Sequence, residues 1–381
     1  MANILYLRYL SRALSRPAPT VGGCENQLIG LIRNLDKTSY RPTVVCSHAG
    51  EFSSKLESFG IPVHISHMPG WRKARSRLSR RLSAMRLTKM AREHHIDLIH
   101  TADLWSNYYA WQVGRSLDIP IISHVRSVLD PERVHKYLFD KFDRIIAISW
   151  RMKESLISGG VPSDKIEVIY DGVDTSIFKP QGEESNVLRR DYPLREHLVG
   201  MVGRIEHFKR QKEFVRAIAQ VLKVRQDVSF LLIGEPEIPD SDYLREVKQS
   251  IEKYGISEHV ILTGYRRDMP EVLRSLDILV TLSGGSIMME AMACGIPVIM
   301  ASAANPADLR IVRDGETGIV VPYDDIDSVS KAILRLLDDG ETRREMGKAG
   351  RARVEELYDM RKIAESTEAV YAKILSKRSE P

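Results

Sequence analysis

The sequence predicts an α/β protein built from two doubly wound domains, each a parallel sheet with helices on both faces. Short apolar runs alternate with segments of helical periodicity along nearly the whole chain, the pattern that crossover helices between parallel strands produce. The apolar runs form two series separated by a polar segment, and 381 residues are enough for two domains.

The expected strands are short runs of Val, Ile and Leu bounded by turn residues. Their nearly continuous apolar character indicates burial on both faces of a sheet. The first series comprises residues 4–7, 43–47, 63–66, 98–100, 121–124, 145–148 and 168–170. The second series comprises residues 198–202, 229–233, 260–263, 278–281, 297–300 and 318–320.

A polar segment at residues 174–197 divides the two series. It contains Pro180 and Pro193 and shows no hydrophobic period, which is typical of a linker. A last helical pattern near residues 360–375 follows the second series. We therefore expect an N-terminal domain, a C-terminal domain and a final helix at residues 1–178, 179–358 and 359–381.

The composition is that of an ordinary soluble protein, with 43% hydrophobic and 28% charged residues. No apolar run reaches the length of a membrane-spanning helix, and the N-terminus lacks the pattern of a secretory signal. The three cysteines, Cys24, Cys46 and Cys294, lack metal-ligand spacing and cannot all pair. These features predict a cytoplasmic protein.

A strongly basic segment at residues 71–92 contains no acid, and Leu78, Leu82, Met85 and Met90 recur in it at helical spacing. The pattern predicts an amphipathic basic helix. One interpretation packs these four side chains on the core beneath a solvated charged face. The other makes the helix a surface for anionic lipid or an anionic acceptor, at the inner face of the plasma membrane. Nucleic acid is not expected as a partner, because no binding module is recognisable.

Three junctions between a loop and a helix carry the candidate site residues. At the first, Gly22 and Gly23 precede a helix, where glycine lets a ligand approach backbone N–H groups. At the second, a strand ends at Gly203 and Arg204, and Lys209 lies at the start of the next helix. A planar donor fork and a point charge together can hold a pyrophosphate. The alternatives at these two junctions are an ordinary turn and a solvated basic loop.

The third junction is a turn of small residues that leads into a helix. The turn comprises Ser283, Gly284, Gly285 and Ser286, and the amides of residues 285–287 can donate to phosphate oxygens. Glu290, about one turn into the helix, can accept hydrogen bonds from vicinal hydroxyls such as those of a ribose. The alternative is a buried glutamate with a structural partner.

Several stretches together resemble the retaining glycosyltransferases of family 4. They read VGRIEHFKRQKEFVRA, IEVIYDGVDTSIFKP, EAMACGIPVI, VRDGETGIVVPYDD and, near the N-terminus, GGCE. The resemblance covers nearly the whole chain. It implies the GT-B fold, in which two Rossmann-like domains face each other across a cleft and the last helix crosses back to the N-terminal domain. It also implies that the C-terminal domain binds a nucleotide-sugar donor and the N-terminal domain binds the acceptor.

The resemblance also assigns roles to individual residues. It implies that Arg204 and Lys209 bind the donor phosphates, that Glu290 binds the ribose, and that His124 lies near the donor sugar. The other residues expected on the donor side are Gly22, Gly23, Gly203, Gly284, Gly285, Ser286 and Ile287. Residues expected on the acceptor or sugar side are Asp103, Trp105, Arg126 and Ser283.

One position departs from the family pattern. Leu282 stands eight residues before Glu290, where members usually have a glutamate that contacts the donor sugar. A leucine side chain cannot accept a hydrogen bond, so Ser283, Ser286 or backbone amides would have to take over that contact. The identity of the donor sugar therefore stays open.

The predicted function is retaining transfer of a sugar from a UDP- or GDP-sugar to a glycan or glycolipid, in the synthesis of cell-surface polysaccharide or lipopolysaccharide. We expect no cofactor beyond the donor and no metal. Two acid pairs, Asp240 with Asp242 and Asp325 with Asp327, superficially match the metal-binding pair of other glycosyltransferases, but both lie in polar turns and are interpreted as solvated. There are two alternatives. One is a non-catalytic accessory subunit that binds a nucleotide sugar, which the leucine at position 282 favours. The other is a sugar-nucleotide epimerase of the same fold.

Overall fold

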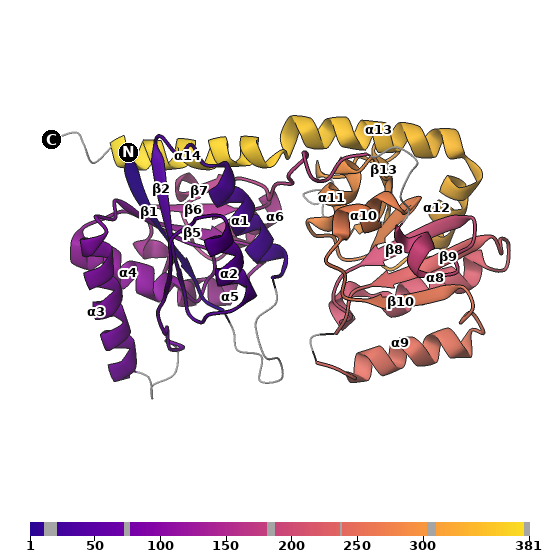
Figure 1. Cartoon of the computed structure of the whole chain (residues 1–381), viewed down its shortest axis with the longest axis horizontal. Coiled ribbons are helices and arrows are strands. Elements are labelled where there is room, and N and C mark those ends of the chain that lie inside the picture. Colours follow the sequence, from indigo (N-terminus) through magenta and orange to yellow (C-terminus); the bar gives the residue numbers. More distant parts are fainter. Residues whose placement is uncertain (11–20, 72–76, 181–186, 237, 303–309, 377–381) are drawn as a thin grey trace. The chain divides into compact units, whose positions relative to one another are not determined.

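The chain forms two compact units in the computed structural model, which describes residues 1–10, 21–71, 77–180, 187–236, 238–302 and 310–376 (Figure 1). The first unit runs to Gly172 and includes the chain from Met360 onward, and the second comprises Val173–Asp359. Each unit contains one parallel sheet. The prediction of two doubly wound α/β domains is confirmed.

The sheet of the first unit has seven parallel strands in the order β3-β2-β1-β4-β5-β6-β7. The order reverses between β1 and β4, and at such a point the loops that follow the two strands diverge and leave room for ligands. Each strand overlaps one of the first predicted series. The strands are β1 (Ala2–Arg8), β2 (Tyr40–Cys46), β3 (Val63–Ile65), β4 (Leu98–Thr101), β5 (Ile121–Val125), β6 (Arg144–Ala147) and β7 (Ile166–Val168).

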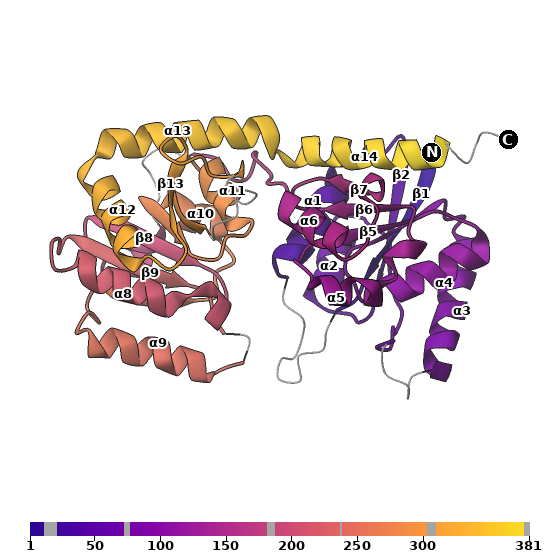
Figure 2. The ribbon, with the colours of Figure 1, turned by 180° about the vertical axis from the view of Figure 1, so that it is seen from behind.

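Two helical layers cover this sheet, one on each face (Figures 1 and 2). Successive strand side chains point to opposite faces, so Ile4 and Tyr6 of β1 join one core cluster and Leu5 and Leu7 join the other. The first cluster includes α1 (Gly23–Asn34), α2 (Glu51–Ser58) and α14 (Met360–Ser376). The second includes α3 (Arg77–Glu93), α4 (Asn107–Leu117), α5 (Pro131–Val134) and α6 (Trp150–Ser158).

The sheet of the second unit has six parallel strands in the order β10-β9-β8-β11-β12-β13, and the order reverses between β8 and β11. The strands are β8 (His197–Val202), β9 (Val228–Ile233), β10 (Val260–Gly264), β11 (Ile278–Thr281), β12 (Val298–Ser302) and β13 (Gly318–Pro322). All six overlap the second predicted series.

The helices of the second unit also divide into groups. One core cluster unites the sheet with α8 (Gln211–Val221), α9 (Asp242–Lys253) and α12 (Ile326–Asp338). The remaining helices are α7 (Val187–Asp191), α10 (Met269–Arg274), α11 (Ile287–Ala293) and α13 (Gly340–Leu357). Helix α11 contacts β11, β12 and α13, so the turn before α11 is anchored to the sheet edge.

The basic helix α3 packs with a different face from the one predicted. Leu78, Leu82 and Met85 are 73%, 45% and 67% exposed, so the expectation that they form a core stripe is wrong. The buried positions are Ser83, Ala84, Leu87 and Ala91. Three of these four side chains are small, which lets α3 approach α4 closely. Residues 72–76 of the basic segment lie outside the described residues.

Within the described ranges, no helix has the length and apolar character needed to cross a bilayer.

Candidate donor site

Four neighbouring strands of the second unit lead into glycines with positive φ angles. Gly203 follows β8, Gly234 follows β9, and Gly264 ends β10, with φ of +151°, +136° and +71°. Gly284 and Gly285, with φ of +68° and +117°, form the turn after β11. These φ values are readily available only to glycine. The carboxyl edge of this sheet is thus lined by backbone without side chains, which suits close approach of a ligand.

The turns after β8 and β9 touch each other. A Cβ atom at Gly234 would lie 2.1 Å from the carbonyl oxygen of Gly203. The amide of Ile205 also donates to the carbonyl of Glu235 at 3.1 Å. These contacts fix the backbone from which Arg204 projects.

Replacing Gly234 by alanine is expected to lower the free energy of unfolding by about 2–4 kcal/mol, because the substitution adds both a left-handed strain and a steric clash. Gly255→Ala is a matched control, since Gly255 also has a positive φ of +64° but no atom within 4 Å of the added Cβ. We expect only about 1–2 kcal/mol there. Guanidinium denaturation measures both losses, and equal losses would refute the close packing of these turns.

Lys209 lies beside two of the glycine turns. It ends a short 3-10 segment, His207–Lys209, just before α8. Its Cε atom is 3.3 Å from the Cβ position of Gly203, and its Nζ atom is 3.7 Å from the Cβ position of Gly285. One ammonium group therefore stands next to the turns that follow β8 and β11, which are adjacent strands.

The ammonium of Lys209 is half-buried and forms no ion pair among the described residues. Burial lowers its pKa, the nearby Arg204 lowers it further, and Glu206 partly offsets the change. Two basic residues near Lys209 in sequence do have acidic partners. Arg210 pairs with Asp324 at 3.0 Å, and Lys212 pairs with Glu246 at 2.8 Å. An anion bound beside the Lys209 ammonium would stabilise its charged form, which burial disfavours.

Arg204 is exposed and pairs with Glu206 at 3.2 Å. Its carbonyl accepts a hydrogen bond from Gln211 Nε2 at 2.8 Å, which holds its backbone against α8. The interpretation of this junction as a solvated basic loop therefore fits Arg204 better than Lys209.

The turn before α11 leaves three backbone donors free. Within the part of the chain that the structure describes, the amides of Gly285, Ser286 and Ile287 donate to no other group, whereas Met288 N already donates to Gly285 O at 3.3 Å. The amides at residues 285–287 are those expected to donate to phosphate oxygens. They lie on the same turn whose Gly285 approaches Lys209.

Glu290 projects from α11 and has a single hydrogen-bond partner among the described residues. Its Oε1 atom accepts from Ser286 Oγ at 3.3 Å. Burial raises the pKa of this carboxyl group from 4.5 to about 7, and the Ser286 hydrogen bond opposes the rise. The carboxyl group therefore retains capacity to accept hydrogen bonds from a ligand.

Ionisation of Glu290 is expected to destabilise the folded protein. Because its folded-state pKa is raised, its stabilising contribution is complete below its ordinary pKa and is lost as the pH rises through about 7. We expect the free energy of unfolding of the wild type, relative to Glu290→Gln, to fall by about 2–3 kcal/mol from about pH 4 to about pH 8. Denaturation of both proteins across this range measures the difference, and a difference independent of pH would contradict the burial of this acid.

Leu282, at the position of the usual family glutamate, belongs to the hydrophobic core. It directly follows β11 and is 1% exposed. Ser283, the next residue, is exposed on the glycine turn. Thr281, on the other side of Leu282, already donates through Oγ1 to the carbonyl of Gly284 at 3.3 Å. Ser283 and Ser286 are therefore the hydroxyl groups of the turn nearest to this position.

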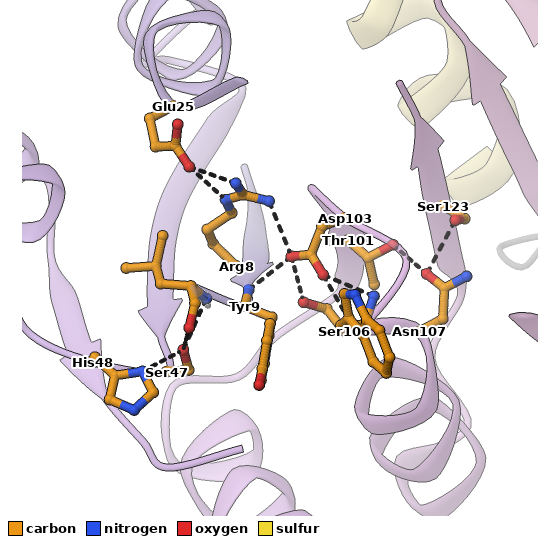
Figure 3. A network of polar contacts seen from close by, with 12 residues as sticks. Arg8, Tyr9, Glu25, Ser47, His48, Thr101, Asp103, Ser106, Asn107 and Ser123 are labelled. Atoms are coloured by element: carbon orange, nitrogen blue, oxygen red, sulfur yellow. Dashed lines mark hydrogen bonds and ion pairs between the residues drawn. The ribbon is translucent and has the colours of Figure 1, made fainter. Parts of the chain in front are cut away.

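In the first unit, an arginine that the sequence reading overlooked organises the carboxyl ends of β1 and β4 (Figure 3). Arg8, the last residue of β1, pairs with Glu25 of α1 and with Asp103 at 3.5 Å. The other carboxylate oxygen of Glu25 accepts from the amide of Gly22 at 3.0 Å. A Cβ atom at Gly22 would lie 2.9 Å from that oxygen, so glycine fits this position best. A charged residue at the end of an apolar strand was the signal that could have identified it.

Asp103 stabilises the turn after β4 through hydrogen bonds (Figure 3). Its carboxylate accepts from the amides of Tyr9, Trp105 and Ser106 and from Ser106 Oγ, at 2.7–3.0 Å. The geometry thus gives Asp103 a structural role. Trp105 beside it is 39% exposed and remains a candidate for acceptor contact.

His124 and Arg126 lie at the end of β5, and both are buried. Arg126 is paired with Asp171, so its guanidinium group is partly occupied within the first unit. The Nε2 atom of His124 is buried and has no hydrogen-bond partner among the described residues. Of the residues expected on the first unit, His124 and Arg126 each have a buried polar atom without a partner among the described residues, Nε2 of His124 and Nε of Arg126. The guanidinium of Arg126 is already paired with Asp171, whereas the second ring nitrogen of His124 is free for a ligand.

One group of three possible metal ligands occurs among the described residues, Glu196, His197 and Asp227. His197 begins β8 and Asp227 precedes β9, so the group lies at the amino edge of the sheet, opposite the glycine turns. Asp227 is also held by Arg225. This group is separate from the candidate site.

Comparisons with known proteins agree with this architecture. Residues 187–353 match the family model described as Glycosyl transferases group 1, and residues 21–177 match Glycosyltransferase Family 4. The lipopolysaccharide core biosynthesis mannosyltransferase LpsB of Rhizobium meliloti is 28% identical over 247 residues, covering 63% of this chain and 68% of LpsB. The capsular polysaccharide biosynthesis glycosyltransferase CapM of Staphylococcus aureus is 29% identical over 240 residues, covering 60% of each.

Solved structures share the fold over the full length. Anabaena HepE in complex with UDP and glucose superposes with a TM-score of 0.82 at 22% identity, covering 97% of this chain and 99% of HepE. The two family models adjoin and together span both units of the chain. The chain therefore belongs to glycosyltransferase family 4, and it is a glycosyltransferase of the GT-B fold that uses nucleotide sugars.

Proposed function

We propose that this enzyme transfers a hexose from a UDP- or GDP-sugar to a glycan or glycolipid, in the synthesis of cell-surface polysaccharide or lipopolysaccharide. The observation that carries the donor assignment is the half-buried ammonium of Lys209, which has no ion-pair partner among the described residues and lies beside Gly203 and Gly285. The names of LpsB and CapM support the class of acceptor. HepE, with UDP-glucose bound, supports the class of donor.

On this proposal the diphosphate of the donor lies along the carboxyl edge of the second sheet. Lys209, the exposed Arg204 and the free amides of residues 285–287 donate to its oxygens. As the bond to the sugar breaks, negative charge grows on the leaving phosphate. Donors already in place stabilise that charge without reorganising, and each contributes on the order of 2–4 kcal/mol.

Glu290 binds the ribose hydroxyls on this proposal. Its half-buried carboxyl group lies beside the turn and has only Ser286 as a hydrogen-bond partner among the described residues. Because Leu282 is apolar and buried, recognition of the transferred sugar falls to Ser283, Ser286 and backbone groups of the same turn. His124 is the first-unit residue that meets the sugar, and Gly22 and Gly23 give the donor and acceptor access to the backbone before α1.

The exposed face of α3 is proposed as a peripheral contact with an anionic membrane. Leu78, Leu82 and Met85 project from it. The exposed basic residues around them are Arg77, Arg81, Arg86, Lys89 and Arg92. An apolar stripe bordered by cations matches the boundary between acyl chains and anionic headgroups. A glycolipid acceptor would be presented at such a surface.

Replacing Leu78, Leu82 and Met85 together by serine is expected to weaken binding to vesicles that contain anionic lipid by about tenfold or more. A matched control replaces Val128, Ile157 and Val224 by serine, since these are also exposed but lie in three separate parts of the chain, two loops and helix α6. Co-sedimentation measures both variants. Equal binding by the α3 variant and the wild type would overturn the proposed contact.

The proposed activity is tested with a panel of UDP-, GDP- and ADP-sugars and lipid-linked or core-oligosaccharide acceptors. Mass spectrometry is expected to show an acceptor heavier by one hexose with a UDP- or GDP-sugar. Nucleotide release with no such product from any acceptor would contradict the proposed acceptor class, and no nucleotide release from any donor would contradict the proposed donor.

A further inference from the structure

A chain of four buried polar side chains crosses the interior of the first unit. It links Tyr6 of β1, Tyr371 of α14, His100 of β4 and His124 of β5. The Tyr6 and Tyr371 hydroxyl oxygens are 2.8 Å apart, Tyr371 Oη is 2.6 Å from His100 Nδ1, and His100 Nε2 is 3.2 Å from His124 Nδ1. The residues are 0–5% exposed. Each hydroxyl carries one proton and can accept two hydrogen bonds, and each neutral imidazole carries one proton on one of its two ring nitrogens.

Three arrangements make all three contacts hydrogen bonds, and they leave different groups without a partner. In one, Tyr6 and His100 both donate to Tyr371 Oη, which leaves the Tyr371 hydroxyl proton without an acceptor and His124 Nε2 unsatisfied. In the other two, all donors point the same way. If donation runs from Tyr6 towards His124, every hydroxyl and His100 find a partner, and only the Nε2–H of His124 remains free. If donation runs the other way, the Tyr6 hydroxyl proton has no acceptor at a fully buried position, and His124 Nε2 is also unsatisfied. The first direction leaves fewer buried polar groups unpaired, and that favours it strongly.

We propose that Tyr371, acting through His100, is a positioning residue that holds His124 as the Nε2–H tautomer, so that its ring donates a hydrogen bond to an oxygen of the bound nucleotide sugar. The inference rests on the proposed position of His124 at the reacting sugar. It adds two residues, His100 and Tyr371, that touch no substrate and that no sequence motif marks. It also gives the last helix of the chain a part in the reaction.

Both imidazoles are neutral in this arrangement. Burial and, to a smaller extent, the charge of Arg126 together lower the pKa of His100 to about 3. The pKa of His124 lies well below its ordinary value for the same two reasons, with His100 adding to them. His124 thus acts as a neutral hydrogen-bond donor and not as a proton source.

The tautomer is observed directly by ¹⁵N NMR of the full-length protein labelled at histidine. In the wild type we expect the protonated ring nitrogen of His124 to be Nε2, with Nδ1 unprotonated. His124→Gln identifies the signal. A wild-type spectrum with Nδ1 protonated overturns the inference, whether or not any further variant folds.

Two phenylalanine variants then test the direction of the chain. Tyr371→Phe removes the donor to His100 and is expected to mix the two tautomers of His124. Tyr6→Phe removes a hydroxyl from the same cluster but leaves Tyr371 free to donate to His100, so the tautomer is expected to stay as in the wild type. If both variants, or neither, change the tautomer, the proposed direction is wrong.

Kinetics separates this inference from the proposed function. Loss of a hydrogen bond of ordinary strength is expected to lower kcat about three- to tenfold in Tyr371→Phe, with KM for the nucleotide sugar nearly unchanged and with Tyr6→Phe within about twofold of the wild type. If the spectra behave as expected but kcat does not fall in Tyr371→Phe, the chain stands as a structural feature and its positioning role is overturned. Transfer by the wild-type enzyme then still supports the proposed function.

Discussion

Lys209→Ala is expected to lower kcat for sugar transfer by about 10²–10³-fold, because it removes a donor that stabilises charge on the leaving phosphate. The protein should remain folded. Lys209 forms no ion pair among the described residues, so its removal leaves no buried acid without a partner. Steady-state nucleotide release measures the activity, and the thermal midpoint of unfolding reports the fold.

Lys212→Ala is the matched control for this variant. Lys212 lies three residues further along and is paired with Glu246 at 2.8 Å, so its charge is already used on the surface of the second unit. Its removal should change kcat by less than about twofold. Wild-type activity in Lys209→Ala would remove the basis of the donor assignment.

Glu290→Ala is expected to weaken binding of the nucleoside diphosphate by about 10²-fold, because hydrogen bonds to a charged or buried acceptor are lost. Transfer should fall by at least as much at donor concentrations below KM. Isothermal titration with UDP and with GDP measures the affinity of the free enzyme for each nucleotide.

Glu316→Ala controls for the loss of a carboxylate from the same unit. Glu316 is exposed and pairs with Arg313 at 3.2 Å, so its replacement should leave nucleotide affinity as it is. An unchanged Kd for both nucleotides in Glu290→Ala would mean that this acid serves the fold and not the ribose.

Much of the fold could be predicted because parallel strands buried on both faces read as short continuous apolar runs. The run at residues 278–281 coincides with β11, whereas the one at 168–170 is shifted by two residues towards the C-terminus relative to β7, Ile166–Val168. Strand ends depend on backbone pairing, and apolar character alone does not define them. Helix α3 was misread for a related reason, since helical periodicity fits both of its faces and only packing against α4 selects the one with Ser83, Ala84 and Ala91.

The candidate site could be predicted in part. Lys209 and Glu290 belong to compact motifs, and local spacing brings each to the carboxyl edge of the sheet. The ion pairs of Arg8 and the chain from Tyr371 to His124 could not be predicted in this way. Tyr371 and His100 are 271 positions apart, and only the packing of α14 in the first unit joins them.

The account is tested most directly by crystal structures of the wild-type enzyme with UDP and with GDP. We expect at least one of the two nucleotides to bind with its phosphates on Lys209, Arg204 and the amides of residues 285–287, and with its ribose hydroxyls on Glu290. A nucleotide bound away from the glycine turns of the second unit, or no binding of either nucleotide, would contradict the account.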